Sequence, residues 1–115
     1  MKNKISFSAI AYCLLFLSSP SSSRDVVTVG VSHFPPFIEI LGGSVGGLAT
    51  QMLDLMNKHQ DKYVFQVFPT LPSTRHETFK IGRYDMSMFD SLDWGWKGLN
   101  VEASDVYLTG GEVFI

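Results

Sequence analysis

Cysteine is nearly absent from this 115-residue sequence, in which Cys13 is the single example. It lies in an apolar stretch near the N-terminus, so the rest of the chain has no thiol. That excludes a disulfide framework, a cysteine-ligated zinc or iron–sulfur centre and thiol catalysis in the rest of the chain. His33, His59 and His76 have no partner at a metal-binding spacing such as i, i+4, and we expect each to be exposed or merely packed.

Positive charge is also scarce. The sequence has 9 lysines and arginines against 11 aspartates and glutamates. Lys2 and Lys4 belong to the N-terminal leader, which leaves 7 basic against 11 acidic residues and a net charge of −4 for the remainder. Such a balance offers no basic patch for nucleic acid or for an anionic membrane surface. We therefore expect no nucleic-acid partner.

A long hydrophobic run is missing as well. The apolar stretch Ile5–Leu17 has 13 residues, whereas about 18 or more are needed to span a bilayer. Lys2 and Lys4 precede this stretch and a serine-rich patch, 18–23, follows it, which is typical of a secretory signal peptide. We predict that residues 1–23 are a signal peptide cleaved near Ser23 and that the protein is periplasmic. The alternative is an N-terminal membrane anchor that is never cut.

The remaining 92 residues, 24–115, have room for one small domain. Runs rich in β-branched and aromatic residues alternate there with amphipathic segments, which is typical of an α/β fold with a mostly parallel sheet flanked by helices. The predicted strands are 26–31, a short return strand within 37–41, 63–68, 84–89 and 111–115; the predicted helices are 47–59 and 72–82.

Local patterns predict how several of these segments are placed. The strand 26–31 is expected to be buried on both faces. Phe79 and Ile81 are expected on the inward side of the second helix, with Gly82 as its C-cap. The glycine-rich segment 42–47 lacks both the G-x-G-x-x-G order and a following Lys-Ser/Thr, so we expect a flexible turn and no phosphate cradle.

Five segments carry a resemblance to a known family. They are Val29–Phe37, Gly46–Leu48, Gly82–Asp85, Ser104–Tyr107 and Gly111–Val113. In this order and at this spacing, they resemble the start of an extracytoplasmic solute-binding protein of the family that serves polar amino-acid ABC transporters. The resemblance implies the type II periplasmic-binding-protein fold, in which a ligand is held between two α/β lobes. Residues 24–115 would then be most of the first, three-layer lobe, truncated near the hinge, with the second lobe absent.

Loops at the carboxyl ends of the strands are the expected ligand-binding region, because open α/β sheets bind ligands there. The loop after the first strand contains Phe34, and the resemblance implies that this aromatic side chain stacks on the ligand. The residues alone leave open whether Phe34 is instead a core aromatic, which is our expectation for Phe37. The loop after the strand 84–89 begins with Asp90 and Ser91, where the family supplies hydroxyl and backbone groups.

This second loop departs from the family pattern. The family places an arginine there that clamps an α-carboxylate, whereas this sequence has only Lys97 in register, without the bidentate fork of arginine. Trp94 and Trp96, with Asp90 and Asp93, would suit a cationic or ring-bearing solute. Alternatively, the two tryptophans cover the edge of the sheet. The predicted ligand-binding residues are Phe34, Asp90, Ser91, Trp94 and Lys97.

These patterns favour a binding protein over an enzyme, since no pair of acids marks glycosidase chemistry and no catalytic, metal or cofactor motif is recognised. The resemblance implies capture of a small polar solute such as an amino acid, delivered to the membrane permease of an ABC transporter by the complete two-lobe protein. Two alternatives remain open: the sensory input module of a membrane signalling protein, and a truncated product without a function of its own.

Overall fold

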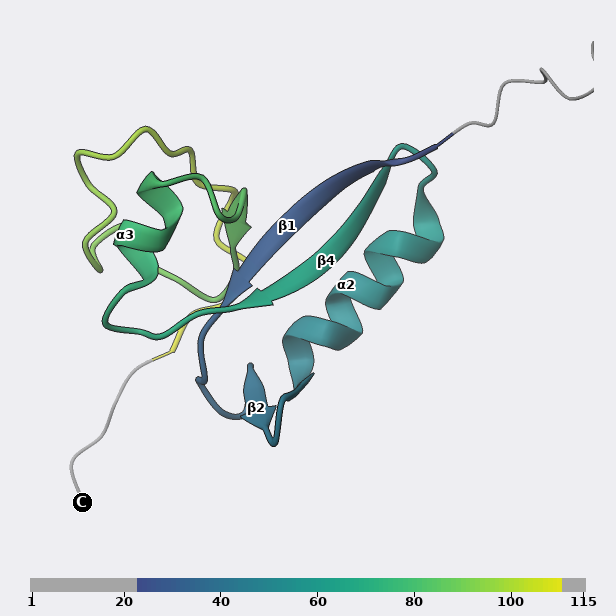
Figure 1. Cartoon of the computed structure of the whole chain (residues 1–115), viewed down its shortest axis with the longest axis horizontal. Helices are drawn as coiled ribbons and strands as arrows, with labels where there is room; N and C mark the ends of the chain where they lie inside the picture. The colour runs from purple at the N-terminus through teal and green to yellow at the C-terminus, as the bar shows by residue number, and fades with distance from the viewer. Residues whose placement is uncertain (1–22, 111–115) are drawn as a thin grey trace, which may run out of the picture.

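A short parallel sheet organises the computed structural model, which describes residues 23–110 (Figure 1). The central strand β1 (Asp25–Val31) pairs in parallel with β4 (Tyr63–Pro69) along its whole length. On its other side it pairs in parallel with β5 (Met86–Ser87), so the strand order is β4-β1-β5. The predicted α/β fold with a parallel sheet is confirmed, and so are the first two principal strands.

An antiparallel hairpin follows β1. It consists of β2 (Glu39–Leu41) and β3 (Ser44–Gly46), joined by Gly42 and Gly43 with φ angles of 57° and 84°. The predicted return strand is therefore present, but the prediction of a turn over 42–47 is wrong for 44–46. Two glycines at positive φ are enough to reverse the chain, so the following residues are free to pair with β2.

Helix α2 (Leu48–His59) starts directly after Gly47, as the sequence predicted. Gly47 has a φ of 93°, and a Cβ atom there would lie 2.7 Å from the carbonyl oxygen of Phe37, so only glycine fits. Ala49 and Leu53 are the buried residues of the helix. Their spacing of one helical turn places both on the face that meets the sheet.

The hydrophobic core lies between α2 and one face of the sheet (Figure 1). Side chains alternate along a strand, so Val29 and Val31 face α2 while Gly30 faces the other way, against the ring of Tyr84. Among the described residues, Tyr84 covers this second face at the carboxyl end of β1. Near the start of the strand, Val26 is 54% exposed. The expectation of burial on both faces is therefore wrong for the first half of β1.

The second helix, α3 (Arg75–Lys80), is shorter than predicted. Phe79 packs inward against the ring of Tyr84, with the ring centroids 5.6 Å apart. Ile81 is the C-cap and is 70% exposed, so its predicted inward position is wrong. The helical turn ends before Ile81 and the φ of 80° at Gly82 redirects the chain. The prediction of Gly82 as the C-cap is therefore wrong by one residue, since Ile81 is the cap and Gly82 is the first residue beyond it.

Strand β5 has two residues instead of the predicted six. The pairing with β1 ends at Ser87, and two residues later Phe89 adopts a φ of 56°, which is uncommon for a residue other than glycine. Residues 1–22 of the predicted signal peptide 1–23 and the predicted strand 111–115 lie outside the described residues. Between residues 23 and 110, no helix has the length and apolar character needed to cross a membrane.

Candidate functional site

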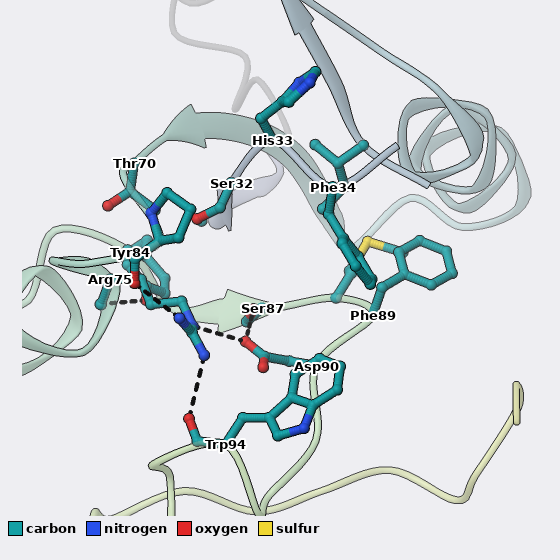
Figure 2. A pocket seen from close by; sticks show the side chains of 14 residues that line it. Ser32, His33, Phe34, Thr70, Arg75, Tyr84, Ser87, Phe89, Asp90 and Trp94 are labelled. Carbon is teal, nitrogen blue, oxygen red and sulfur yellow. Dashed lines mark hydrogen bonds and ion pairs between the residues drawn. The ribbon is translucent and has the colours of Figure 1, made fainter. Parts of the chain in front are cut away.

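A pocket lies where the three parallel strands end (Figure 2). Ser32 follows β1, Thr70 follows β4 and Ser87 is the last residue of β5, and all three line it. Its volume is about 150 Å³. The carboxyl ends of parallel strands are where open α/β sheets bind ligands, so topology and cavity identify the same region.

Aromatic side chains form one wall of the pocket. Phe34 begins a tight turn in which its amide donates to the carbonyl oxygen of Ile38 over 2.8 Å. Its ring lies 5.4 Å from that of Phe37 and 6.2 Å from that of Trp94, nearly perpendicular to the indole at 87°. Phe34 is 39% and Trp94 51% exposed. Together these two rings make a corner against which a flat apolar group can pack.

Arg75 brings a positive charge to the opposite wall. It comes from the first turn of α3, and its side chain is 22% exposed. Its Nη1 donates to the carbonyl oxygen of Pro72 over 2.8 Å, and its Nη2 donates to that of Trp94 over 3.2 Å. Its Nε lies 3.5 Å from Oδ2 of Asp90. The guanidinium is therefore held in place on all three nitrogens.

Asp90 supplies the matching negative charge, with a side chain only 16% exposed. Its Oδ2 accepts a hydrogen bond from the hydroxyl of Ser87 over 3.1 Å, in addition to the ion pair with Arg75. Its Oδ1 accepts from the amide of Ser91 over 3.2 Å. These contacts fix the carboxylate beside the guanidinium, and the two charges balance within the pocket.

Tyr84 holds α3 against the sheet behind this pair. Its hydroxyl donates to the carbonyl oxygen of Arg75 over 2.6 Å, and its ring covers Gly30. Burial raises the pKa of the Tyr84 phenol, and the nearby carboxylate of Asp90 raises it further. The phenol therefore remains a hydrogen-bond donor to higher pH than an exposed tyrosine would.

Three of the five predicted ligand-binding residues, Phe34, Asp90 and Trp94, line the pocket. Ser91 and Lys97 do not. Ser91 uses its hydroxyl to accept a hydrogen bond from the amide of Asp93. Lys97 pairs with Asp93 over 2.7 Å on the surface, where both side chains are about three-quarters exposed. Lys97 was expected in the pocket from its position along the loop. The loop coils into successive turns, which direct this side chain to solvent.

The two tryptophans are separated. Trp96 is only 5% exposed and packs against the rings of His76 and Phe79, at 4.6 and 5.4 Å between centroids. Its indole nitrogen is buried, and within residues 23–110 it has no hydrogen-bond partner. Trp96 therefore belongs to a small core beside α3, and the idea that both tryptophans meet a solute is wrong for it. Phe37 packs against the main core, as expected.

Sequence reasoning missed Arg75, Thr70 and Ser87. It considered the loops after the first and third strands, whereas Thr70 and Arg75 follow the second, β4. Applying the carboxyl-end rule to every parallel strand would have found Thr70. Arg75 could have been noticed as a cation in the first turn of the helix that Pro72 precedes, although only the folded chain shows that it meets Asp90.

The histidines are exposed or packed, as expected. His33 is exposed, and its Nδ1 accepts a hydrogen bond from the amide of Ile40 over 2.9 Å. His59 is exposed at the end of α2. His76 packs on Trp96. In the part of the chain that the structure describes, no group of three His, Cys, Asp or Glu side chains is placed to hold a metal ion.

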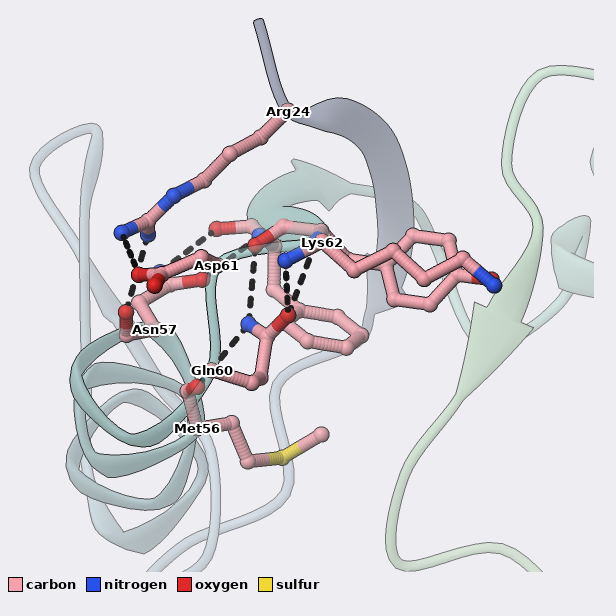
Figure 3. Close-up of polar contacts among 8 residues, drawn as sticks. Arg24, Met56, Asn57, Gln60, Asp61 and Lys62 are labelled. Carbon is pink, nitrogen blue, oxygen red and sulfur yellow. Dashed lines mark hydrogen bonds and ion pairs between the residues drawn. The ribbon is translucent and has the colours of Figure 1, made fainter. Parts of the chain in front are cut away.

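A second polar cluster surrounds the turn between α2 and β4 (Figure 3). The amide nitrogen of Gln60 donates to the carbonyl oxygens of Met56 and Tyr63, at 3.0 and 2.8 Å. Its oxygen accepts from the backbone amides of Lys62 and Tyr63, at 3.0 and 2.7 Å. All four contacts are to backbone groups of the turn and of the ends of α2 and β4 beside it, so Gln60 has a structural role.

Replacing Gln60 with alanine is expected to lower the free energy of unfolding by about 1–3 kcal/mol, because backbone groups of the turn lose their partners. Urea titration followed by circular dichroism measures the change. His59→Ala is the matched control, since His59 is the exposed neighbour, and we expect a change within about 0.5 kcal/mol. Equal effects of the two substitutions would contradict a structural role for Gln60.

Comparison with known proteins adds no relative to this description. No family model matches the sequence, and no curated protein or solved structure matches the chain. The α/β fold and its pocket therefore rest on the chain's own sequence and structure, and the resemblance to solute-binding proteins remains a prediction.

Proposed function

We propose that this chain is the first lobe of an extracytoplasmic solute-binding protein that captures a small polar solute for an ABC transporter. In this proposal the leader 1–23 directs export to the periplasm, and the complete two-lobe protein docks on the membrane permease. The lobe adopts the type II periplasmic-binding-protein arrangement and works by binding, without catalysis.

The observation that carries the proposal is the pocket at the carboxyl ends of β1, β4 and β5. Its aromatic corner, Phe34 and Trp94, is exposed enough to meet a solute. Its opposite wall carries hydroxyl groups and a paired guanidinium and carboxylate. An apolar wall that faces a few fixed polar groups is the usual composition of a small-molecule site.

Binding to this lobe alone is expected to be weak. Sites of useful affinity bury about 70–90% of a ligand, and the half-exposed ring of Trp94 shows that this pocket is open on one side. Stacking and a few exposed polar contacts contribute on the order of 1 kcal/mol each, while even millimolar affinity requires about 4 kcal/mol. Detection must therefore tolerate dissociation constants in the millimolar range or above.

Amide chemical-shift titration of the chain meets this requirement. The panel consists of amino acids, polyamines, small organic acids and pyridine derivatives. We expect at least one solute to shift the amides of Ser32, Thr70 and Ser87 in a saturable way. Phe34→Ala should weaken that binding by about 3- to 10-fold, the loss of one aromatic contact. Leu41→Ala, at a 67% exposed residue of β2 outside the pocket, is the control.

Either of two results would count against the proposal. One is a panel in which no solute shifts any amide of the pocket. The other is a saturable response that Phe34→Ala and Leu41→Ala change equally, because the solute would then bind elsewhere.

A further inference from the structure

The pocket contains an arginine that already has an internal carboxylate. Arg75 faces Asp90 through Nε at 3.5 Å, while its two terminal nitrogens donate to the carbonyl oxygens of Pro72 and Trp94. A ligand carboxylate normally binds a guanidinium through two parallel hydrogen bonds. Two of the five N–H groups of Arg75 are used by the backbone carbonyls, and the carboxylate of Asp90 lies beside the Nε. A ligand carboxylate that used the remaining N–H groups would therefore lie next to a fixed negative charge.

Moving the carboxylate of Asp90 away from Arg75 would break two hydrogen bonds. Its two oxygens accept from the hydroxyl of Ser87 and the amide of Ser91. If the carboxylate swung away from Arg75, those two donors would lose their partner. If it stayed, an incoming anion would meet a second negative charge beside the guanidinium, and like charges at such distances repel.

We propose that the pocket selects uncharged, ring-bearing solutes and discriminates against free carboxylates, because the fixed carboxylate of Asp90 already offsets the charge of Arg75 and repels a second anion. This inference rests on the proposed solute-binding function and specifies its substrate class. A cationic group gains nothing either, since the attraction of Asp90 is offset by the repulsion of Arg75. A neutral solute avoids both penalties.

Size and wall chemistry agree with this class. A cavity of about 150 Å³ is of the size that holds a benzene ring in an engineered apolar cavity. Such a ring can lie in the corner formed by Phe34 and Trp94, whose rings stand at 87° to one another. The hydroxyls of Ser32 and Thr70 line the same pocket and can serve a neutral hydrogen-bonding edge.

Three pyridines with a small substituent at the same ring position, each of a different charge, test the proposal on the whole chain. Nicotinamide is neutral, nicotinate is an anion and 3-(aminomethyl)pyridine is mostly a cation at neutral pH. Amide chemical-shift titration gives a dissociation constant for each. We expect nicotinamide to bind the unsubstituted protein most tightly. Nicotinate as the tightest ligand would overturn the proposal, because the Arg75–Asp90 pair would then open for a carboxylate.

Asp90→Asn supplies the second arm. Asparagine can still accept a hydrogen bond from Ser87 or Ser91 but removes the negative charge beside Arg75, so we expect nicotinate affinity to rise roughly tenfold or more, as for a new charged hydrogen bond. Asp93→Asn makes the same change in charge at a surface residue outside the pocket and should leave all three affinities unchanged.

The outcomes separate this inference from the proposed function. If Asp90→Asn retains its amide spectrum and nicotinate affinity does not rise, the internal-carboxylate proposal is wrong while solute binding stands. If Asp90→Asn fails to fold, the ranking of the three pyridines on the unsubstituted protein still decides. If no solute in either panel shifts a pocket amide, the proposed function itself fails.

Discussion

Replacing Leu53 with alanine is expected to lower the free energy of unfolding by about 2–5 kcal/mol, the range for deleting most of a buried leucine side chain. Leu53 is 3% exposed and packs with Val29 and Val31 in the cluster between α2 and the sheet. This core is small, so few neighbouring side chains can shift to fill the cavity that the substitution leaves. The loss is a large part of the stability of a small domain, about 5–15 kcal/mol in total.

Leu55→Ala is the matched control for this prediction. Leu55 lies two residues further along α2, so the substitution removes the same atoms from the same helix. Its side chain, however, is 55% exposed. We expect a change within about 0.5 kcal/mol. Urea unfolding followed by circular dichroism measures both variants. Comparable losses would mean that the outer face of α2 is covered in solution by something the structure does not show.

Gly30→Ala has the second large expected effect. A Cβ atom at Gly30 would lie 2.5–2.7 Å from three carbon atoms of the Tyr84 ring. That ring cannot move aside easily, because its hydroxyl donates a hydrogen bond to the carbonyl oxygen of Arg75 and the ring packs against Phe79. We expect a loss of about 1–3 kcal/mol or more from this overpacking. Because Arg75 belongs to the pocket, solute binding should weaken as well.

Gly46→Ala controls for the general cost of adding a methyl group to a strand glycine. Gly46 lies at the end of β3, and the nearest atom to a Cβ there is the carbonyl oxygen of Glu39 at 4.0 Å. Its substitution should change the free energy of unfolding by less than about 0.5 kcal/mol. A neutral effect of Gly30→Ala would show that Tyr84 does not pack on β1 in solution.

Local sequence was sufficient for the elements with a clear period. The β-branched run of β1 and the apolar spacing of α2 predicted both elements to within one residue. Their pattern repeats over many residues, so it outweighs single exceptions. Short elements were less well predicted. Strand β5 was expected to have six residues, but it pairs with β1 only through Met86 and Ser87.

The candidate site was predicted in part for the same physical reason. Phe34, Asp90 and Trp94 follow strands directly, so the rule that ligands bind at the carboxyl ends of strands finds them. Lys97 and Arg75 could not be distinguished in this way. Both are cations near such loops, and which one meets Asp90 depends on how the loop coils and where α3 packs.

By itself, the sequence determined the order of the parallel strands and the helices, the α/β class and two of the loops in which the pocket forms, because these follow from local periodicity and chain direction. Only the tertiary structure decided which charges meet. Tyr84 packs on Gly30 and holds α3 in position, which brings Arg75 to Asp90 across 15 positions of sequence. Contacts between distant residues depend on the packing of whole elements, and no local pattern encodes them.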